Sequence, residues 1–131
     1  MRMISVLHKN GNSVTIEREI PYKKLYFLNS PVITSEGMFQ YRKIGIEEAR
    51  EIAQAYANNC ESAIGHESTA QLLSALLELN VPAERKAISM QVDEAAIILQ
   101  LTGRLPEGFI LTDIEQLEKI GYQLGLLERI L

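Results

Sequence analysis

The sequence is poor in the residues from which disulfide frameworks, metal centres and base-stacking surfaces are built. Its 131 residues include 1 cysteine, 2 histidines and no tryptophan, and aromatic residues make up 6%. The lone Cys60 permits neither an intrachain disulfide nor a multi-cysteine metal site, so we interpret it as an inert core residue of a protein in a reducing cytoplasm. His8 and His66 lie far apart with no repeated carboxylate spacing, so we expect no metal and interpret His8 as a solvated surface residue.

Long apolar runs and an excess of positive charge are also absent. No run approaches the roughly 18 apolar residues that a membrane-spanning helix needs, and residues 1–8 turn polar too soon for a signal peptide. Lys and Arg number 13 against 17 Asp and Glu, which gives a net charge of -4. We therefore expect a cytoplasmic protein with neither a membrane nor a duplex nucleic acid as partner. A small anionic ligand held by a few placed cations is compatible with this charge.

Hydrophobic residues make up 47% of the chain, and their spacing alternates between strand and helix periods. Residues 3–8 and 13–18 flank an Asn-Gly turn and predict an N-terminal β-hairpin. We expect further strands at 25–28, 38–44, 86–92 and 95–101. We expect helices at 46–56, at 67–79 and after a capping box at 112–115. The type of element at 122–131 is left open.

These elements predict a single α/β domain, in which a mixed β-sheet is flanked by about three helices. We place that domain at residues 23–131 and the β-hairpin, residues 1–22, as an extension of it. The helix at 67–79 has no charged residue between Glu67 and Glu78. We expect such a helix to be buried in the core or pressed into a subunit interface.

The most informative stretch is residues 62–69, Ser-Ala-Ile-Gly-His-Glu-Ser-Thr, a small-residue loop that leads into a helix. The first turn of a helix has unpaired N–H groups and a partial positive charge, so it is a natural anion site. Gly65 lets a phosphate approach the backbone, Ser68 and Thr69 offer hydroxyls, and His66 adds a titratable group. The alternative interpretation is that the side chains of this stretch only cap the helix.

A second group of candidates surrounds the end of the strand predicted at 95–101. It comprises Gln100, Arg104 and Glu107, and Arg85 is a further cation just before the strand predicted at 86–92. The planar fork of an arginine suits a pair of phosphate oxygens, and a nearby carboxylate orients it. The alternative is a set of surface ion pairs, each worth about 0–1 kcal/mol.

Three segments, taken in order, resemble one protein family. They are 25–31 (Leu-Tyr-Phe-Leu-Asn-Ser-Pro), 62–70 (Ser-Ala-Ile-Gly-His-Glu-Ser-Thr-Ala) and 104–108 (Arg-Leu-Pro-Glu-Gly). Together they look like the type III anti-CRISPR ring nucleases of archaeal viruses and phages, which have relatives in bacteria and mobile elements. The match covers roughly residues 25–131, and the Ser-x-Ile-Gly-His-x-Ser-Thr motif is its most specific part. The N-terminal hairpin lies outside it.

The resemblance implies a homodimer that binds cyclic tetra-adenylate in a two-fold symmetric pocket. It implies cleavage to linear di-adenylate with a 2′,3′-cyclic phosphate, without metal or cofactor, which shuts off type III CRISPR signalling. The motif match makes His66, Arg104 and Glu107 the catalytic residues. The implied substrate-binding residues are Asn29, Ser30, Ile64, Gly65, Ser68, Thr69, Arg85 and Gln100.

In the implied reaction a ribose 2′-hydroxyl attacks its own 3′-phosphate and expels the next 5′-oxygen, which His66 protonates. Arg104 and the helix N-terminus stabilise the charge on the phosphate. Across a dimer axis the ring meets two copies of each cation, so an acidic protein can carry a locally positive pocket. Two other functions stay open. One is a non-catalytic module that sequesters or senses a cyclic oligonucleotide, and the other is a small viral interaction protein.

Overall fold

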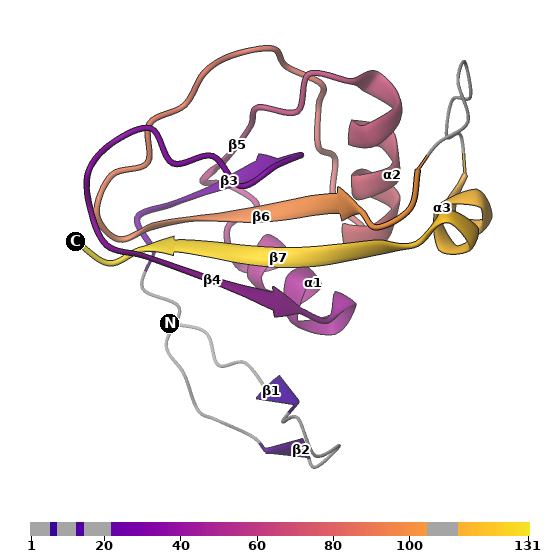
Figure 1. The fold of residues 1–131 in the computed structure, drawn as a ribbon, viewed down its shortest axis with the longest axis horizontal. Coiled ribbons are helices and arrows are strands. Elements are labelled where there is room, and N and C mark those ends of the chain that lie inside the picture. Colours follow the sequence, from indigo (N-terminus) through magenta and orange to yellow (C-terminus); the bar gives the residue numbers. More distant parts are fainter. Residues whose placement is uncertain (1–5, 8–12, 15–21, 105–112) are drawn as a thin grey trace.

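A mixed five-stranded sheet organises the part of the chain that the computed structural model describes, residues 6–7, 13–14, 22–104 and 113–131 (Figure 1). Its strands are β3 (Lys24–Leu28), β4 (Phe39–Ile44), β5 (Cys60–Ser62), β6 (Glu94–Leu101) and β7 (Tyr122–Arg129). They lie in the order β4-β7-β6-β3-β5. β3 pairs in parallel with β5 and β6, whereas β7 is antiparallel to β6 and β4.

The parallel pairing brings the carboxyl ends of β3, β5 and β6 to one edge of the sheet, which we name the carboxyl edge. Phe27 is level with Ser62, and Leu28 is level with Ile98. Because β7 runs the opposite way, it begins at this edge, where Gln123 pairs with Gln100. Residues that follow separate strands in the sequence therefore meet at one place in the fold.

Helices cover one face of the sheet, behind the strands in Figure 1. Within the described residues they are α1 (Ile46–Ala55), α2 (Glu67–Leu77) and the short α3 (Ile114–Ile120). The apolar stripe of α1 and the leucines of α2 are buried against inward-facing strand residues such as Leu25, Phe27 and Ile97. This core explains why α2 carries no charged residue after Glu67. The architecture confirms the predicted α/β class, with a mixed sheet and flanking helices.

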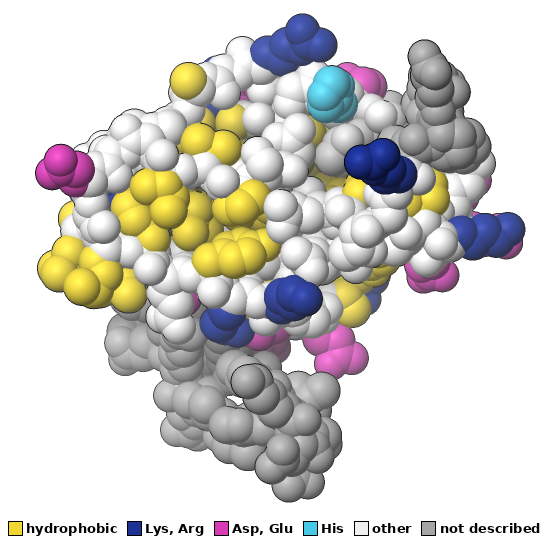
Figure 2. Space-filling model, in the orientation of Figure 1, with side chains coloured by type: hydrophobic (Ala, Val, Ile, Leu, Met, Phe, Trp, Pro, Cys, Tyr) yellow, Lys and Arg dark blue, Asp and Glu magenta, His cyan; other side chains and the backbone are white. Residues whose placement is uncertain are grey.

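The opposite face of the sheet, which we name the open face, carries a smaller apolar cluster. It consists of Tyr26, Leu28, Met90, Ala96, Ile98 and Leu127. No helix of the described residues covers it, and Figure 2 shows hydrophobic side chains gathered there. Val32 and Ile33, in the loop after β3, are 47% and 58% exposed. An apolar surface of this kind is typical of a face that binds a partner.

The N-terminal strands β1 (Val6–Leu7) and β2 (Ser13–Val14) form a separate antiparallel pair, with Val6 opposite Val14. The domain boundary at residue 22 stays a prediction.

The prediction of a strand at 86–92 is wrong. Its alternation is real, because Ile88 and Met90 pack on the open face while Ala87 and Ser89 are exposed. However, the sheet positions beside β6 are already filled by β3 and β7, so the segment crosses the open face without strand pairing. A period of two therefore identified a half-buried extended segment rather than a strand.

Two further elements differ from the sequence predictions or add to them. β5 was not predicted, because three residues, Cys-Glu-Ser, carry no hydrophobic pattern; its pairing with β3 defines it. The residue that caps α3 is Asp113, whose carboxylate accepts from the Gln116 amide at 2.8 Å, one position later than the predicted box. The open segment 122–131 contains β7, which lies between β6 and β4.

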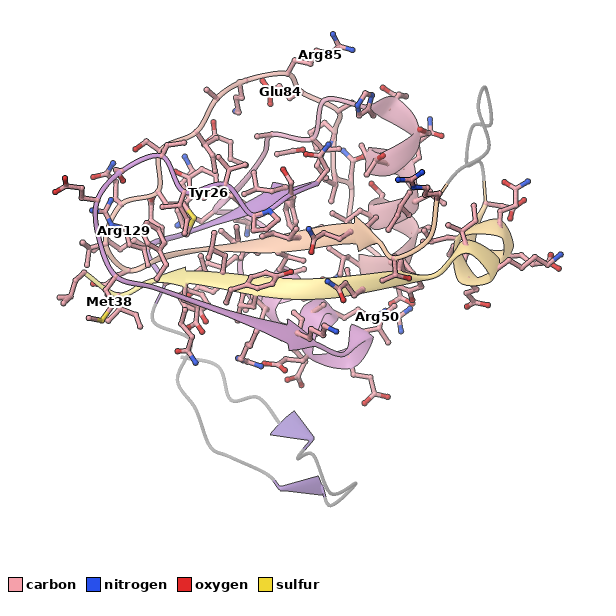
Figure 3. The ribbon with its side chains drawn as sticks, viewed as in Figure 1. Tyr26, Met38, Arg50, Glu84, Arg85 and Arg129 are labelled. Atoms are coloured by element: carbon pink, nitrogen blue, oxygen red, sulfur yellow. The ribbon has the colours of Figure 1, made fainter. Side chains whose placement is uncertain are left out.

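Arg129, at the end of β7, ties the loop before β4 to the sheet. Its guanidinium donates to the Met90 carbonyl, to Ser35 Oγ at 3.3 Å and to the Glu36 carbonyl at 2.9 Å. It also lies over the Phe39 ring, 5.5 Å from the ring centroid. Figure 3 shows it among these segments, far from the carboxyl edge. One side chain thus joins the loop, the segment that crosses the open face, and the last strand.

Replacing Arg129 with lysine should lower the free energy of unfolding by about 1–3 kcal/mol, because an ammonium cannot satisfy this fork of acceptors. Urea unfolding of both proteins measures the difference. Arg104→Lys makes the same change at an exposed position and should stay within about 0.5 kcal/mol of the original protein. An equal loss in the two variants would contradict the role given to Arg129.

Candidate functional site

The candidate residues of the described chain lie at or just beyond the carboxyl edge of the sheet. Asn29 and Ser30 follow β3, the His66 loop follows β5, and Arg104 follows β6. In open α/β sheets, ligands bind outside the carboxyl ends of the strands. The fold thus collects at one edge residues that are widely separated in the sequence. Figure 2 shows histidine and basic side chains exposed on this side of the molecule.

Buried contacts fix the backbone of the loop between β5 and α2. Ile64 is fully buried, its amide donates to Ser62 Oγ at 3.3 Å, and its carbonyl accepts from the Glu84 amide at 2.8 Å. The Ala63 amide donates to the Phe27 carbonyl at 3.0 Å. Ile64 therefore anchors the loop, which suits a positioning role better than direct contact with a ligand.

His66 is the N-cap residue of α2, and its carbonyl accepts from the Ala70 amide at 3.0 Å. Its imidazole is exposed and makes no capping hydrogen bond, so it faces solvent at the start of the helix. Ser68 and Thr69 lie half-buried in the first turn. The side chain of the N-cap residue itself thus forms no cap, and the alternative in which Glu67, Ser68 or Thr69 serves the helix start stays open.

Arg85 contacts the same loop. Its Nε donates to the Gly65 carbonyl at 3.2 Å, and a Cβ placed on Gly65 would lie 3.1 Å from Arg85 Cγ. The glycine therefore gives the arginine stem room to lie against the loop. Figure 3 shows Arg85 projecting outward from the chain just before the segment that crosses the open face. Arg85 therefore precedes the extended segment 86–92, which is not the expected strand.

A cavity of about 230 Å³ lies beside this loop and contains two of the predicted residues. Its lining residues are Leu28, Asn29, Ser30, Val32, Thr34, Ala63, Lys86, Ala87 and Ile88. Sequence reasoning missed Lys86. The signal was available, because the alternation over 86–92 places Lys86 on the same side as Ile88 and hence toward the open face.

Lys86 belongs to an ion cluster with Glu61 on β5. Lys24 and Lys86 both bond the Glu61 carboxylate, and Glu84 lies 3.4 Å from Lys86 Nζ. The hydrogen bonds from the two lysines lower the pKa of Glu61 to about 2. The same carboxylate raises the pKa of Lys86. One ammonium at the cavity wall is thus held charged and in place.

The residues around the end of β6 form a separate group. Gln100 Oε1 accepts from the Tyr41 hydroxyl at 3.0 Å and from Gln123 Nε2 at 3.1 Å; sequence reasoning missed both partners. Arg104 is exposed and makes no ion pair within the described residues, nor does a hydrogen bond there join it to His66. The third predicted catalytic residue, Glu107, lies outside the described residues.

The remaining candidates concern other chemistry. Burial raises the pKa of the Cys60 thiol, which disfavours a reactive thiolate. His8 lies outside the described residues. In the described ranges no group of three or more His, Cys, Asp or Glu is arranged to hold a metal ion. Among those residues, no helix is long and apolar enough to cross a membrane.

The Glu61 cluster should make stability depend on acid pH. A carboxylate whose folded pKa is about 2 stabilises the fold above the unfolded value near 4.5, and that stabilisation is lost as pH falls toward 2. Glu61→Gln should therefore unfold more easily than the original protein at pH 7, with the difference shrinking by pH 2–3. Urea unfolding at several pH values measures this. Glu118→Gln, at an exposed site on α3, should leave the profile unchanged; a Glu61→Gln difference independent of pH would contradict the assignment.

Relatives of this chain occur in viruses and in a bacterium. Residues 25–124 match the family model described as STIV B116-like. Uncharacterized protein ORF117 of Acidianus two-tailed virus is 34% identical over 109 residues, covering 81% of this chain and 93% of that protein. Uncharacterized protein YddF of Bacillus subtilis is 38% identical over 107 residues, covering 82% and 98%.

The fold has a solved counterpart. B116 of Sulfolobus turreted icosahedral virus matches with a TM-score of 0.65 and 19% identity, covering 80% of this chain and 98% of that one. At this identity the likeness concerns the fold alone. The family match, which spans most of the described sheet, and the relatives above 30% identity together establish that the chain belongs to the STIV B116-like family.

Proposed function

We propose that this protein is a metal-independent ring nuclease. It binds cyclic tetra-adenylate and cleaves it to linear di-adenylate with a 2′,3′-cyclic phosphate, which ends type III CRISPR signalling. One observation carries the proposal. One edge of the sheet carries the exposed His66 at the start of α2 together with the basic side chains Arg85 and Arg104, which come from other segments. Such an edge suits a phosphodiester, because both the helix start and the cations stabilise negative charge.

The substrate itself supplies the nucleophile of the proposed reaction. The ribose 2′-oxygen forms a bond to its own phosphorus, the bond from phosphorus to the 5′-oxygen breaks, and the 2′ proton passes to solvent. His66 donates a proton to the departing 5′-oxygen. Its exposed imidazole, free of capping duty, leaves it available for that transfer. Arg104 and the first-turn amides of α2 stabilise the charge that develops on the phosphate, and Glu107 stays a predicted member of this group.

Substrate contacts are divided between the two groups of residues at the edge. Arg85 and the hydroxyls of Ser68 and Thr69 surround the His66 loop, and Asn29 and Ser30 line the neighbouring cavity. Lys86 adds a cation on the wall of the same cavity. A phosphodiester placed across the edge would therefore meet donors from each parallel strand's following loop.

A second copy of the chain is the partner we propose for the open face. Val32 and Ile33, in the loop after β3, are exposed, and Val32 lies in the wall of the cavity that contains Asn29, beside Ile88 of the open-face segment. Burial of such side chains stabilises association, at roughly 25 cal/mol for each Å² of apolar surface. A two-fold axis through this face would duplicate the cationic edge around a ring of matching symmetry.

Cleavage of labelled cyclic tetra-adenylate in excess EDTA tests the chemistry. The original protein should yield di-adenylate with a cyclic-phosphate end. His66→Ala should lower the rate about 10²- to 10⁴-fold, because the leaving oxygen loses its acid, while the affinity for the ring is retained. Glu67→Gln changes the adjacent exposed residue and should keep full activity.

The outcomes of this experiment separate the candidate functions. Tight binding by both proteins without cleavage would replace the nuclease with a module that sequesters the ring. Absence of binding would contradict both and favour a small interaction protein. Cleavage that EDTA abolishes and Mg²⁺ restores would contradict the metal-independent step.

The proposed dimer should depend on the open face. Ile33→Glu puts a charge on that face and should shift the sedimentation of the protein toward the monomer, with weaker ring binding. Ala75→Glu, at an exposed position of α2 on the other face, should leave the dimer intact. Equal sedimentation of the two variants would show that the open face is not the interface.

A further inference from the structure

The side-chain amide of Gln100 is held by a network that neither the family motif nor the proposed reaction explains. Gln100 lies on β6 one residue before its end, opposite Gln123 on β7. Its Oε1 accepts hydrogen bonds from the Tyr41 hydroxyl at 3.0 Å and from Gln123 Nε2 at 3.1 Å. Three strands, β4, β6 and β7, therefore converge on one oxygen atom.

These two bonds fix which end of the amide is available. An amide oxygen has two lone pairs, and both are used here. The amide oxygen is committed to the β4 and β7 side, so the NH₂ group is turned away from it. No described residue accepts a hydrogen bond from that nitrogen. If the β3–β6 register of Leu28 with Ile98 is continued by two residues, Ser30 stands beside Gln100. The NH₂ group of Gln100 therefore lies at the carboxyl edge.

The position of Tyr41 is itself built into the sheet. A Cβ on Gly125 would collide with the Tyr41 ring and hydroxyl, so the ring lies directly on the backbone of β7. Only glycine allows this approach, and the aromatic ring covers the surface that the missing side chain leaves bare. Tyr41 is paired with Leu127, so the ring leans along the strand toward Gly125 and reaches Gln100 from there. The register of β4 with β7 and the absence of a side chain at Gly125 therefore fix the Tyr41 hydroxyl beside Gln100.

We infer that Tyr41 and Gln123 are positioning residues that hold the Gln100 amide so that its NH₂ group donates to a phosphate oxygen of the bound ring. This inference rests on the proposed function. A phosphate oxygen only accepts hydrogen bonds, so an amide presented by its oxygen would repel it, whereas one presented by its nitrogen binds it. Because the Tyr41 hydroxyl donates to Gln100, its effect on ring binding is expected to pass through that amide.

A double-mutant cycle tests the inference. Ring affinity is measured in the His66→Ala background, which prevents turnover. Tyr41→Phe removes one hydroxyl and keeps the ring on Gly125, so the fold is preserved and thermal unfolding confirms it. We expect binding of cyclic tetra-adenylate to weaken about three- to tenfold, the range of one hydrogen bond. In a Gln100→Ala background the same substitution should have no further effect.

Tyr26→Phe is the matched control. Tyr26 lies on the same face and donates to Glu94 at the other end of β6, at 3.1 Å, so its loss should not change ring affinity. A readout without ligand accompanies it. In ¹H–¹⁵N spectra of the free protein, Tyr41→Phe should shift the side-chain NH₂ signals of Gln100, and Tyr26→Phe should not.

Each outcome separates this inference from the proposed function. Suppose that the His66→Ala parent binds the ring. If Tyr41→Phe then leaves the affinity unchanged, or lowers it by the same factor in the Gln100→Ala background, the positioning role is overturned and the proposed function stands. If the parent fails to bind the ring, the proposed function falls and the role of Gln100 toward phosphate falls with it. Unchanged Gln100 NH₂ signals would overturn the network itself.

Discussion

The parallel pairing of β3 with β5 and β6 is the constraint on which the rest of the structure depends. Parallel neighbours end at the same edge, so the loop after each strand is delivered to one place. Asn29, His66 and Arg104 are otherwise separated by long stretches of chain and share no local contact that would assemble them. Antiparallel pairing of any one of these strands would send its loop to the far edge.

The asymmetry of the two sheet faces follows from the same topology. α1 and α2 pack on one face and bury the larger core, which leaves the open face with an extended segment and a smaller cluster. A helix on both faces would bury these apolar side chains within one chain. With helices on one side only, exposed residues such as Val32 and Ile33 lie next to the carboxyl edge. The edge proposed to bind the ring and the face proposed to bind a second copy are therefore adjacent.

Several elements could be predicted from local pattern. The stripe of Ala49, Ile52 and Ala53 identified α1, and a short, wholly apolar run identified the buried β3. β5 could not be predicted, because its three residues become a strand only through pairing with β3. The alternation at 86–92 was ambiguous for the same reason, since a period of two reports on burial and not on hydrogen bonding.

The candidate site divides in the same way. The Gly-His loop was evident from its small residues and its position before a helix, and the structure adds that Arg85 packs on Gly65. Tyr41 and Gln123 were not predicted, because cross-strand contacts bring them to Gln100 and nothing in the sequence specifies that register. The alternation over residues 86–92 places Lys86 on the same side as Ile88, but the same period of two also predicts a strand.

We propose that one cyclic tetra-adenylate occupies the paired carboxyl edges of two chains. Calorimetric titration with a ring whose 2′-hydroxyls are blocked measures this directly, because it separates binding from cleavage. We expect saturation at one ring for every two chains. Saturation at one ring per chain would contradict the shared site, and the absence of any binding would contradict the function assigned to this edge.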